Sequence, residues 1–372
     1  MMRAALVSAL CLATAASWSR LELALQNYPR VHDRNLRAFE KGDPAARIVR
    51  AKVKNGLGNR EQALLSGFAL ALAANAALVV EWPPRGCDNY AGVAVSCDEA
   101  GAEELYERPP FNWTAPEAVA RAKAAKSLNY HGFEATLQRA NLFDITRGVL
   151  DVGTDHHYLL AVFCNERVNS TRLFPPDALT AQRTLERYLL RPVRRIRDAV
   201  RGALTRAGGC ALGVHARSQK RSHGDETPFT KLLPLLGDRG GLFVASDGHS
   251  AWLQQELYAA ARARNVSVVE LGLPPGAVGA LAENYALSEC DRLVPTRRSS
   301  FFRLAAVRSK RPHVRAVWAC PATELQSRAM VSSGATVESC NVMAQCPAPG
   351  GRYTYRRRRL GAFGEPRRAG AL

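Results

Sequence analysis

Several features that mark other protein classes are missing from these 372 residues. No apolar run reaches the roughly 20 residues that a membrane-spanning helix needs. The chain has no Cys-x-x-Cys pair, which disfavours a zinc site, and no Gly-x-Ser-x-Gly elbow, which leaves a serine hydrolase with little support. Aromatic residues make up only 7% of the chain, which weighs against a nucleic-acid-binding protein.

Acidic residues are also scarce. The chain has 33 of them against 51 lysines and arginines, which gives a formal net charge of +18. This charge attracts polyanions, anionic membranes or phosphorylated small molecules. Only 8 of the basic residues are lysines, and such an arginine excess can follow from the base composition of a genome, so it does not indicate a nucleic-acid partner.

The amino terminus and the cysteines indicate export. Residues 1–19 combine a basic start, a short apolar core and small residues, which predicts a signal peptide or a short signal-anchor. Beyond this leader eight cysteines remain, an even number that favours disulfides, and Cys87 and Cys97 are close enough in sequence for a local bond. Glycosylation sequons occur at Asn112, Asn169 and Asn265. We therefore expect a protein of the endoplasmic reticulum or Golgi lumen, which meets a membrane only if the leader is uncleaved.

The first half of the chain begins with one β-α-β unit, made of a strand, a glycine turn, a buried helix and a second strand. In order, these elements span residues 47–53, 55–60, 61–74 and 77–82. The segment that follows, 83–209, is less regular. In it we expect a strand at 158–164 and a basic amphipathic helix at 187–206, for which a surface position is favoured over membrane or nucleic-acid binding.

The second half alternates strands and helices more regularly. Strands are expected at 210–216, 241–246, 266–271 and 292–295, and helices at 228–236, 251–264 and 277–289. This alternation predicts a parallel sheet with helices on both faces. The fold class is therefore α/β, with two Rossmann-like domains that face each other across a cleft. After the leader we expect a lead-in at 20–46, the two domains at 47–205 and 206–346, and a basic, poorly ordered tail at 347–372.

Three strand ends of the second half carry polar residues. His215 and Arg217 lie at the end of the first, Asp247 at the end of the second, and Ser299 and Ser300 beyond the last. Because the carboxyl ends of parallel strands meet at one edge, these side chains would face one crevice. A guanidinium, a carboxylate and a helix start together suit a nucleotide diphosphate. A solvated basic loop is the alternative interpretation of the first cluster.

Four motifs carry a resemblance to known enzymes. Asn55-Gly-Leu-Gly-Asn-Arg60, with the helix and the Leu-Val-Val-Glu-Trp strand that follow, resembles the opening of plant cell-wall fucosyltransferases. Gly213-Val-His-Ala-Arg217, Phe243-Val-Ala-Ser-Asp247 and the stretch from Ser288 to Phe301 resemble the three donor motifs of the α1,2, α1,6 and protein O-fucosyltransferase superfamily. The motifs occur in the expected order, whereas segment 83–209 has no counterpart that we can name.

The resemblance implies a GT-B glycosyltransferase that moves fucose from GDP-fucose to a glycan or glycoprotein acceptor, with inversion and without a metal or other cofactor. It implies that Arg217 holds the β-phosphate and stabilises the departing GDP. His215 would lie against the diphosphate or ribose, and Asp247 or Asp291 would contact guanine or ribose. The other implied donor-binding residues are Ser299, Ser300 and Phe301, around the pyrophosphate or base, and Asn59 and Arg60, which face the cleft from the first half.

The chain departs from the superfamily pattern in two places. Ser218 follows Arg217 where many relatives have a second arginine, and Lys220 or Arg221 could replace that charge. An unusual pair of arginines, Arg297 and its neighbour, precedes the serines of the third motif. These differences leave the subfamily and the donor sugar open.

Other interpretations also stay open. Asp225 and Glu226 lie near the first motif and could act as a general base, but exposed loop positions are the simpler interpretation. Asp155-His-His157 lacks further ligands at a recognised spacing, so a metal site there is disfavoured. A glycan-binding protein that kept the fold but lost turnover is the alternative to an enzyme, and a basic polyanion binder is a third hypothesis.

Overall fold

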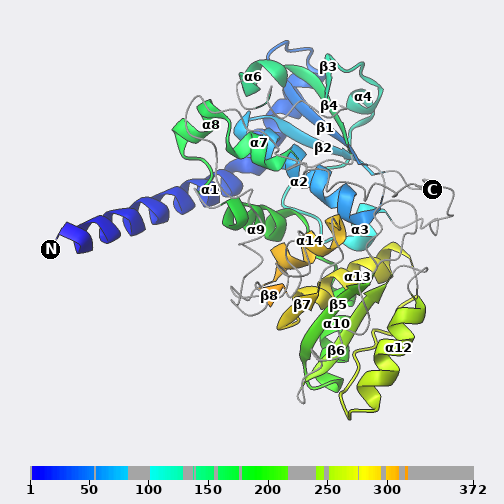
Figure 1. The fold of residues 1–372 in the computed structure, drawn as a ribbon. Coiled ribbons are helices and arrows are strands. Elements are labelled where there is room, and N and C mark those ends of the chain that lie inside the picture. The colour runs from blue at the N-terminus through cyan, green and yellow to red at the C-terminus, as the bar shows by residue number, and fades with distance from the viewer. Residues whose placement is uncertain are drawn as a thin grey trace, which may run out of the picture.

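The computed structural model consists of two parallel β-sheets and the helices around them (Figure 1). It describes residues 2–53, 56–82, 101–128, 137, 140–154, 158–175, 178–216, 240–246, 251–274, 276–294, 299–309 and 315–316. Some of the sequence predictions lie outside these residues, namely the bond between Cys87 and Cys97, the Asp155-His-His157 site, the helix at 228–236 and the tail at 347–372.

The first sheet has four parallel strands in the order β2-β1-β4-β3. The strands are β1 (Arg47–Val53), β2 (Ala77–Glu81), β3 (Lys126–Leu128) and β4 (Gly148–Thr154). Helix α2 (Leu57–Ala73) lies between β1 and β2 in the chain, which confirms the predicted β-α-β unit. The alanine and leucine side chains of α2 are buried from Ala63 to Leu72, so this helix forms the centre of the core.

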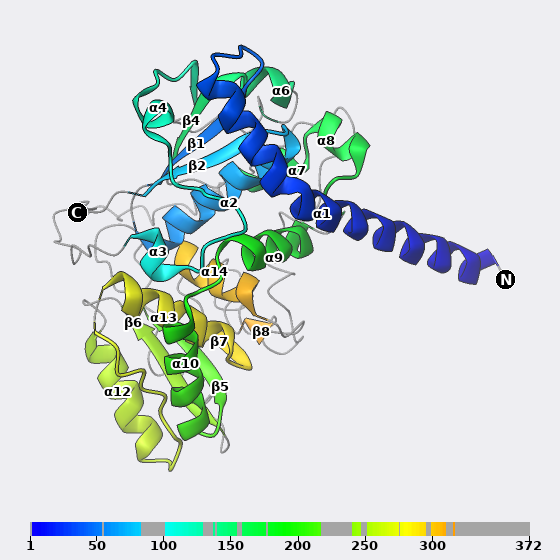
Figure 2. The ribbon, with the colours of Figure 1, turned by 180° about the vertical axis from the view of Figure 1, so that it is seen from behind.

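A long helix, α1 (Met2–Glu40), packs on the first sheet with its carboxyl-terminal half. The Tyr28 hydroxyl donates to the Ala76 carbonyl oxygen at 3.1 Å and accepts from the Leu78 amide at 2.9 Å. The amino-terminal half extends away from the rest of the protein (Figures 1 and 2). The predicted end of the leader, at residue 19, therefore falls inside one continuous helix.

The second sheet has four parallel strands in the order β6-β5-β7-β8. They are β5 (Cys210–Ala216), β6 (Gly241–Ser246), β7 (Arg292–Val294) and β8 (Arg315–Ala316). The helices of this half are α12 (Ala251–Arg262), α13 (Ala277–Ser288) and α14 (Ser300–Arg308). The predicted parallel sheet is confirmed. Its strand order reverses at β5, because β6 lies on one side of β5 and β7 on the other.

One predicted strand of the first half is wrong. Residues 158–164 contain helix α7 (Leu159–Phe163), which packs against α2. A short apolar run does not by itself distinguish a buried strand from a buried helix. The prediction also missed both strands that precede α7, namely β3, which has only three residues, and β4, in which Asp151 interrupts the apolar run and glycines lie at Gly148 and Gly153.

The single basic helix predicted at 187–206 is also wrong, because two helices share this segment. They are α9 (Ala178–Leu189) and α10 (Arg194–Arg206). Pro192 separates them, since proline has no amide hydrogen to donate and disfavours the helical conformation of the residue before it. Pro192 pairs instead with Tyr106 in an isolated antiparallel bridge.

The strand predicted at 266–271 is reduced to one bridging residue. The Leu242 amide donates to the Ser267 carbonyl oxygen, and the Val269 amide donates to the Leu242 carbonyl oxygen, each at 2.8 Å. Beyond this contact the chain leaves the edge of the sheet at Gly272, whose φ of 65° lies in the left-handed region. The segment therefore touches β6 at a single point rather than extending the sheet.

The two sheets are joined by one apolar core and by helices that lie between them (Figure 1). Helix α14 packs against α2 and α9 on one side and against α13 on the other. Leu64 of α2 and Leu304 of α14 belong to the same buried cluster as Leu293 of β7. Four short helices complete the described structure, α3 (Ala102–Leu105), α4 (Glu117–Arg121), α6 (Leu142–Ile145) and α8 (Glu166–Thr171).

A disulfide bond ties the start of β5 to the short segment between α13 and β7. Cys210 and Cys290 are bonded with their Cα atoms 4.6 Å apart, and Cys164 is also disulfide-bonded, which confirms that cysteines of this chain form disulfides. A Cβ atom at Gly213 would lie 2.9 Å from the Cys290 sulfur. The absence of a side chain at Gly213 therefore leaves room for this bond.

Candidate functional site

The carboxyl end of β5 meets the first turn of α14. This helix begins after Ser299, whose hydroxyl accepts a hydrogen bond from the Phe302 amide at 3.1 Å. Ser299 is buried and Ser300 is half-buried, and the first turn contains no acidic residue. The partial positive charge of the helix start is therefore not neutralised from within the helix, and such a start favours a bound anion.

A pair of stacked rings connects this helix start to β5. The ring centroids of His215 and Phe301 are 5.3 Å apart, and the ring planes are inclined by 28°. His215 is buried near the end of β5, and Phe301 is the second residue of α14. The sequence predicted that both residues would contact the same ligand, and the structure brings the two side chains into contact with each other.

The first turn of α2 reaches the same place from the other half of the protein. A Cβ atom at Gly58 would lie 2.6 Å from the backbone nitrogen of Phe301. Only glycine fits there, because the neighbouring atoms belong to the backbone of α14. Asn59 and Arg60 follow directly and are half-buried, and the Arg60 guanidinium lies 5.4 Å from the ring centroid of Trp82. The residues predicted in the first half are thus next to those predicted in the second.

Other predicted residues are not brought to this place by the described part of the structure. Asp291 is exposed and precedes β7, and its amide donates to the Cys210 carbonyl oxygen at 2.9 Å. That position is the amino-terminal edge of the sheet, whereas His215 lies near the carboxyl-terminal edge. Arg217 and Asp247 lie outside the described residues, directly after the ends of β5 and β6, which are paired in register. Also outside are Ser218, Lys220, Arg221, Asp225, Glu226 and Arg297.

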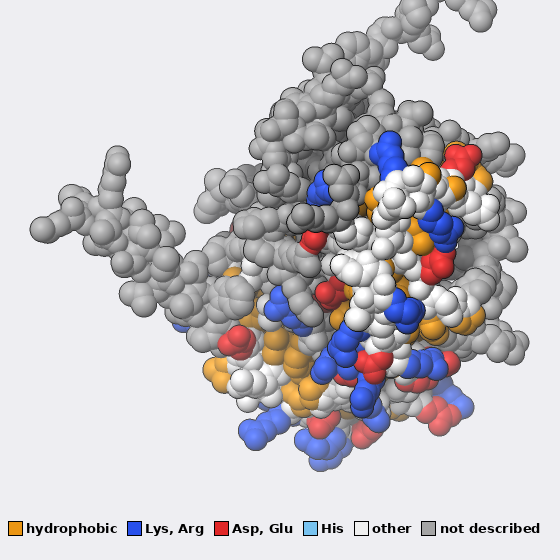
Figure 3. All heavy atoms as spheres, turned by 90° about the horizontal axis from the view of Figure 1, so that it is seen from below, with side chains coloured by type: hydrophobic (Ala, Val, Ile, Leu, Met, Phe, Trp, Pro, Cys, Tyr) orange, Lys and Arg blue, Asp and Glu red, His pale blue; other side chains and the backbone are white. Residues whose placement is uncertain are grey.

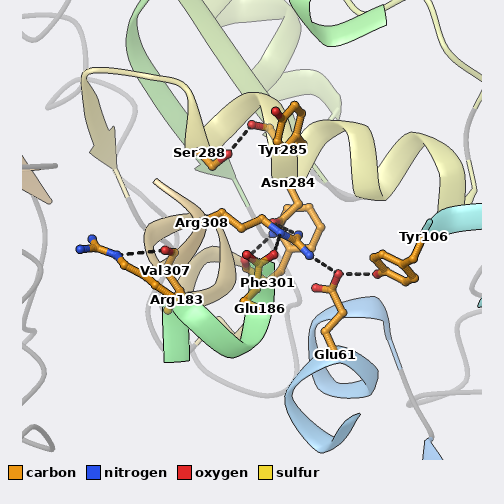
Figure 4. Close-up of polar contacts among 10 residues, drawn as sticks. All are labelled: Glu61, Tyr106, Arg183, Glu186, Asn284, Tyr285, Ser288, Phe301, Val307 and Arg308. Carbon is orange, nitrogen blue, oxygen red and sulfur yellow. Dashed lines mark hydrogen bonds and ion pairs between the residues drawn. The ribbon is translucent and has the colours of Figure 1, made fainter. Parts of the chain in front are cut away.

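A buried charged cluster that the sequence did not predict surrounds the side chain of Arg308, the last residue of α14 (Figure 4). Arg308 donates through Nε to Glu186 Oε1 and through Nη2 to Glu61 Oε1, each at 2.5 Å. Its Nη1 donates to Asn284 Oδ1 at 2.5 Å, and the Tyr106 hydroxyl donates to Glu61. These five residues, called the Arg308 cluster below, come from α14, α9, α2, α13 and the residue that ends α3.

Burial and charge act in opposite directions within the Arg308 cluster. Burial raises the pKa of Glu186, and the nearby Arg308 offsets this only in part. Burial by itself lowers the pKa of Arg308, but Glu61 and Glu186 raise it by more, so the guanidinium stays charged. Burial and the charge of Glu61 hold the pKa of Tyr106 well above its usual value, so its hydroxyl remains a donor.

One sequence signal pointed toward the Arg308 cluster. Glu61 is an acidic residue that directly precedes the apolar part of a helix expected to be buried, and a carboxylate that is buried needs a partner. The partner, Arg308, is 247 residues further along the chain. The sequence could therefore indicate that a partner exists, but not which residue it is.

The charged side chains of the molecular face in Figure 3 are of both signs. Lysine and arginine side chains lie there with aspartate and glutamate side chains among them. On α10, Arg194 pairs with Asp198 at 3.2 Å and Arg197 pairs with Glu107 at 2.6 Å, while Ile196 and other apolar residues face the core. The prediction of an amphipathic surface helix is confirmed for α10.

The described residues contain no group of three histidine, cysteine, aspartate or glutamate side chains placed to hold a metal ion. None of the helices among these residues is both long enough and apolar enough to cross a bilayer.

Comparison with known proteins gives a result for the structure but not for the sequence. No protein-family model matches the chain, and no curated protein is significantly similar to it. The structure is similar to that of a mutant of Arabidopsis thaliana FUT1 in complex with GDP, with 18% identity, coverage of 80% of this chain and 78% of that chain, and a TM-score of 0.55. This likeness confirms the fucosyltransferase-like fold that the motifs predicted.

Two further solved structures are less similar. The fucosyltransferase NodZ from Bradyrhizobium is 18% identical, with 70% of this chain and 92% of that chain covered and a TM-score of 0.39. POFUT1 in complex with GDP-fucose is 13% identical, with 72% of this chain and 95% of that chain covered and a TM-score of 0.42. Because these TM-scores are low, we assign the fold from the Arabidopsis protein alone.

Proposed function

We propose that this protein is a glycosyltransferase that transfers fucose from GDP-fucose to a glycan or glycoprotein acceptor, with inversion and without a metal ion. The observation that carries the proposal is the stack of His215 on Phe301 beside the helix start at Ser299. This stack lies where the strand order of the second sheet reverses, which is where open α/β sheets hold their ligands. The similar Arabidopsis protein was solved in complex with GDP.

In this proposal the diphosphate of the donor binds at the first turn of α14. Backbone amides and the Ser300 hydroxyl supply hydrogen bonds there, and the helix start supplies partial positive charge. Arg217 adds a guanidinium, whose paired N–H groups match two phosphate oxygens. The rings of His215 and Phe301 border the ribose or the base, and Asp247 accepts hydrogen bonds from one of these two groups.

Inversion at C1 of fucose determines which bond forms and which bond breaks. An oxygen of the acceptor attacks C1 of fucose on the face opposite to GDP, while the bond from C1 to the β-phosphate oxygen breaks. The electron pair of the broken bond stays on GDP, and the proton of the acceptor hydroxyl passes to a general base. Arg217 and the helix start stabilise the negative charge that develops on the β-phosphate, so no metal ion is required for this task.

The acceptor would approach from the first half of the protein. Gly58 brings the start of α2 against the start of α14, so Asn59 and Arg60 border the proposed donor site. The proposed arrangement is GT-B-like, with the acceptor bound between the two halves. Segment 83–209, for which the sequence motifs gave no counterpart that we can name, would supply the contacts that select the acceptor.

We also propose that the protein works in the lumen of the endoplasmic reticulum or Golgi. The bond between Cys210 and Cys290 supports this location, because disulfides persist in oxidising compartments. The leader at 1–19 and the glycosylation sequons give further support.

Titration calorimetry of the full-length protein with GDP, UDP and GDP-fucose in the presence of EDTA tests the proposal. We expect GDP to bind selectively, and Arg217→Ala to weaken binding by at least about tenfold, because a guanidinium–phosphate pair is a charge-assisted contact. The matched control is Arg194→Ala, since the Arg194 side chain is 86% exposed on α10 and lies outside every motif. UDP binding in place of GDP would exclude GDP-fucose as donor, and binding of neither nucleotide would support the glycan-binding alternative.

A further inference from the structure

We propose that Asn284 is a positioning residue of the donor site, because it fixes the first turn of α14 and thereby sets the place of Phe301 against His215. The inference rests on the proposed function, since the site that it serves is the proposed donor site. Asn284 lies on α13 and is 0% exposed, and no sequence motif singled it out.

The two ends of the Asn284 amide have different partners (Figure 4). Oδ1 accepts from Arg308 Nη1 at 2.5 Å, and Nδ2 donates to the Phe301 carbonyl oxygen at 2.6 Å. A guanidinium can only donate and a carbonyl oxygen can only accept, so the orientation of the amide follows from its neighbours. Asn284 therefore connects the buried guanidinium to the helix start.

Helix α14 is held at both of its ends. At the first turn, the Phe301 carbonyl oxygen accepts from Asn284, and the Phe301 backbone lies against Gly58. At the last residue, Arg308 donates to Asn284 and to Glu61. Gly58 and Glu61 lie within one turn of α2, so a single turn of the first half contacts both ends of α14. Gly58 and the Arg308 cluster thus hold this helix at its first turn and at its last residue.

The consequence for the donor site follows from the ring stack. Phe301 supplies both the carbonyl oxygen that Asn284 holds and the ring that lies 5.3 Å from His215. Without the amide donor, the first turn of α14 loses this hydrogen bond from α13 and is less restrained against a shift. A shift changes the Phe301–His215 contact and the direction of the backbone amides that would bind the diphosphate. Asn284 acts on the ligand only through this turn.

Two substitutions of Asn284 separate this role from general stability. Asn284→Asp keeps an acceptor for Arg308 but removes the donor to Phe301, and Asn284→Ala removes both. The matched control is Asn165→Ala. Asn165 is also 0% exposed, and its amide donates to the backbone carbonyl oxygens of Leu137 at 2.5 Å and Ala140 at 3.0 Å, on the first half of the protein.

The measurement is made on the full chain with two readouts. The first is the NMR spectrum of the labelled histidine rings, in which the His215 signal is identified with His215→Gln and reports the ring current of Phe301. The second is the dissociation constant of GDP. We expect both Asn284 variants to shift the His215 signal and to bind GDP about tenfold more weakly, the effect of one or two lost hydrogen bonds. We expect Asn165→Ala to lower the melting temperature without either change.

An unchanged His215 signal in a folded Asn284 variant would overturn the inference, and so would an equal change in Asn165→Ala. If the wild-type protein binds no GDP, the proposed function fails, while the histidine spectrum still decides whether Asn284 positions Phe301. If Asn284→Asp does not fold because of its added carboxylate, Asn284→Ala provides the same comparison without new charge.

Discussion

Two arginines of this protein are held between carboxyl groups, one inside the core and one on a sheet. Arg308 lies between Glu61 and Glu186 in the Arg308 cluster. On the first sheet, Arg50 pairs with Asp151 at 2.5 Å and lies 3.4 Å from Glu81. Lys52 also contacts both of these carboxylates, at 2.9 Å and 3.8 Å respectively, and these four residues are called the Arg50 cluster below.

The two clusters differ in charge balance and in access to water. The Arg50 cluster has two cations for two carboxylates, and the side chains of Lys52 and Glu81 are 36% and 34% exposed. The Arg308 cluster has one cation for two carboxyl groups, and all three are buried. As a result, the carboxyl pKa values move in opposite directions. Burial raises the pKa of Glu186, whereas for Asp151 hydrogen bonds from Arg50 and Lys52 outweigh burial and lower it.

The largest effect is expected from Arg308→Met, which removes the only cation of its cluster. Two buried carboxyl groups and the Asn284 amide then lose their partner, so the free energy of unfolding should fall by about 3–5 kcal/mol. Urea titration followed by circular dichroism measures this loss. A triple variant that adds Glu61→Gln and Glu186→Gln removes the unpaired charges and should recover much of the stability. No recovery would show that packing, rather than charge, accounts for the loss.

Arg50→Met should have a smaller effect, of about 1–3 kcal/mol. Lys52 remains beside Asp151 at 2.9 Å, so the carboxylate keeps a cation. The loss arises mainly because Arg50 Nη1 no longer donates to the backbone carbonyl oxygens of Val119 and Ala120, at 2.7 Å and 2.9 Å. The same urea titration measures this loss in the free energy of unfolding. A loss as large as that of Arg308→Met would contradict the distinction between the two clusters.

The dependence of stability on pH should have opposite signs for the two clusters. Because the pKa of Glu186 is raised above 4.5, its contribution is fully present below that pH and is lost as the pH rises toward the folded-state pKa. Because the pKa of Asp151 is lowered below 3.8, its contribution is present above that pH and is lost as the pH falls through the folded-state pKa.

The variants Glu186→Gln and Asp151→Asn isolate these two contributions. The difference in melting temperature between wild type and Glu186→Gln should change with pH above about 4.5, and the difference for Asp151→Asn should change only in more acidic solution. Burial raises the pKa of Glu283 to about 7, and this contribution cancels because it is common to all three proteins. Difference curves with the same sign of slope would refute the assignment.

The smallest effect is expected from Arg194→Ala, which removes an exposed pair on α10. The side chains of Arg194 and Asp198 are 86% and 47% exposed, and they are one turn apart on the helix. Pairs of this kind contribute about 0.3–0.5 kcal/mol at most, so urea titration should barely distinguish the variant from wild type. A loss above about 1 kcal/mol would mean that the exposure of a charged pair does not predict how much its removal destabilises this protein.

The sequence predicted β1 and β2 of the first sheet and β5, β6 and β7 of the second, and it placed His215, Ser299 and Ser300 at one edge. Those predictions depend on short-range patterns, such as alternating apolar residues and polar residues after a strand. Its errors occurred where the pattern was short or ambiguous. The run at 158–164 is as compatible with a helix as with a strand, and the helix at 187–206 required Pro192 to be given more weight than the periodicity around it.

The sequence by itself determined the alternation of strands and helices, the glycines that permit close approach, and the polar residues that end the strands of the second sheet. The tertiary structure alone decided that Gly58 meets Phe301, that His215 stacks on the same residue, and that Arg308 finds Glu61 and Asn284. The physical reason is the separation along the chain over which each effect acts. Periodicity and turn chemistry act over a few residues, whereas a buried charge selects its partner from whatever the folded chain brings within hydrogen-bond distance.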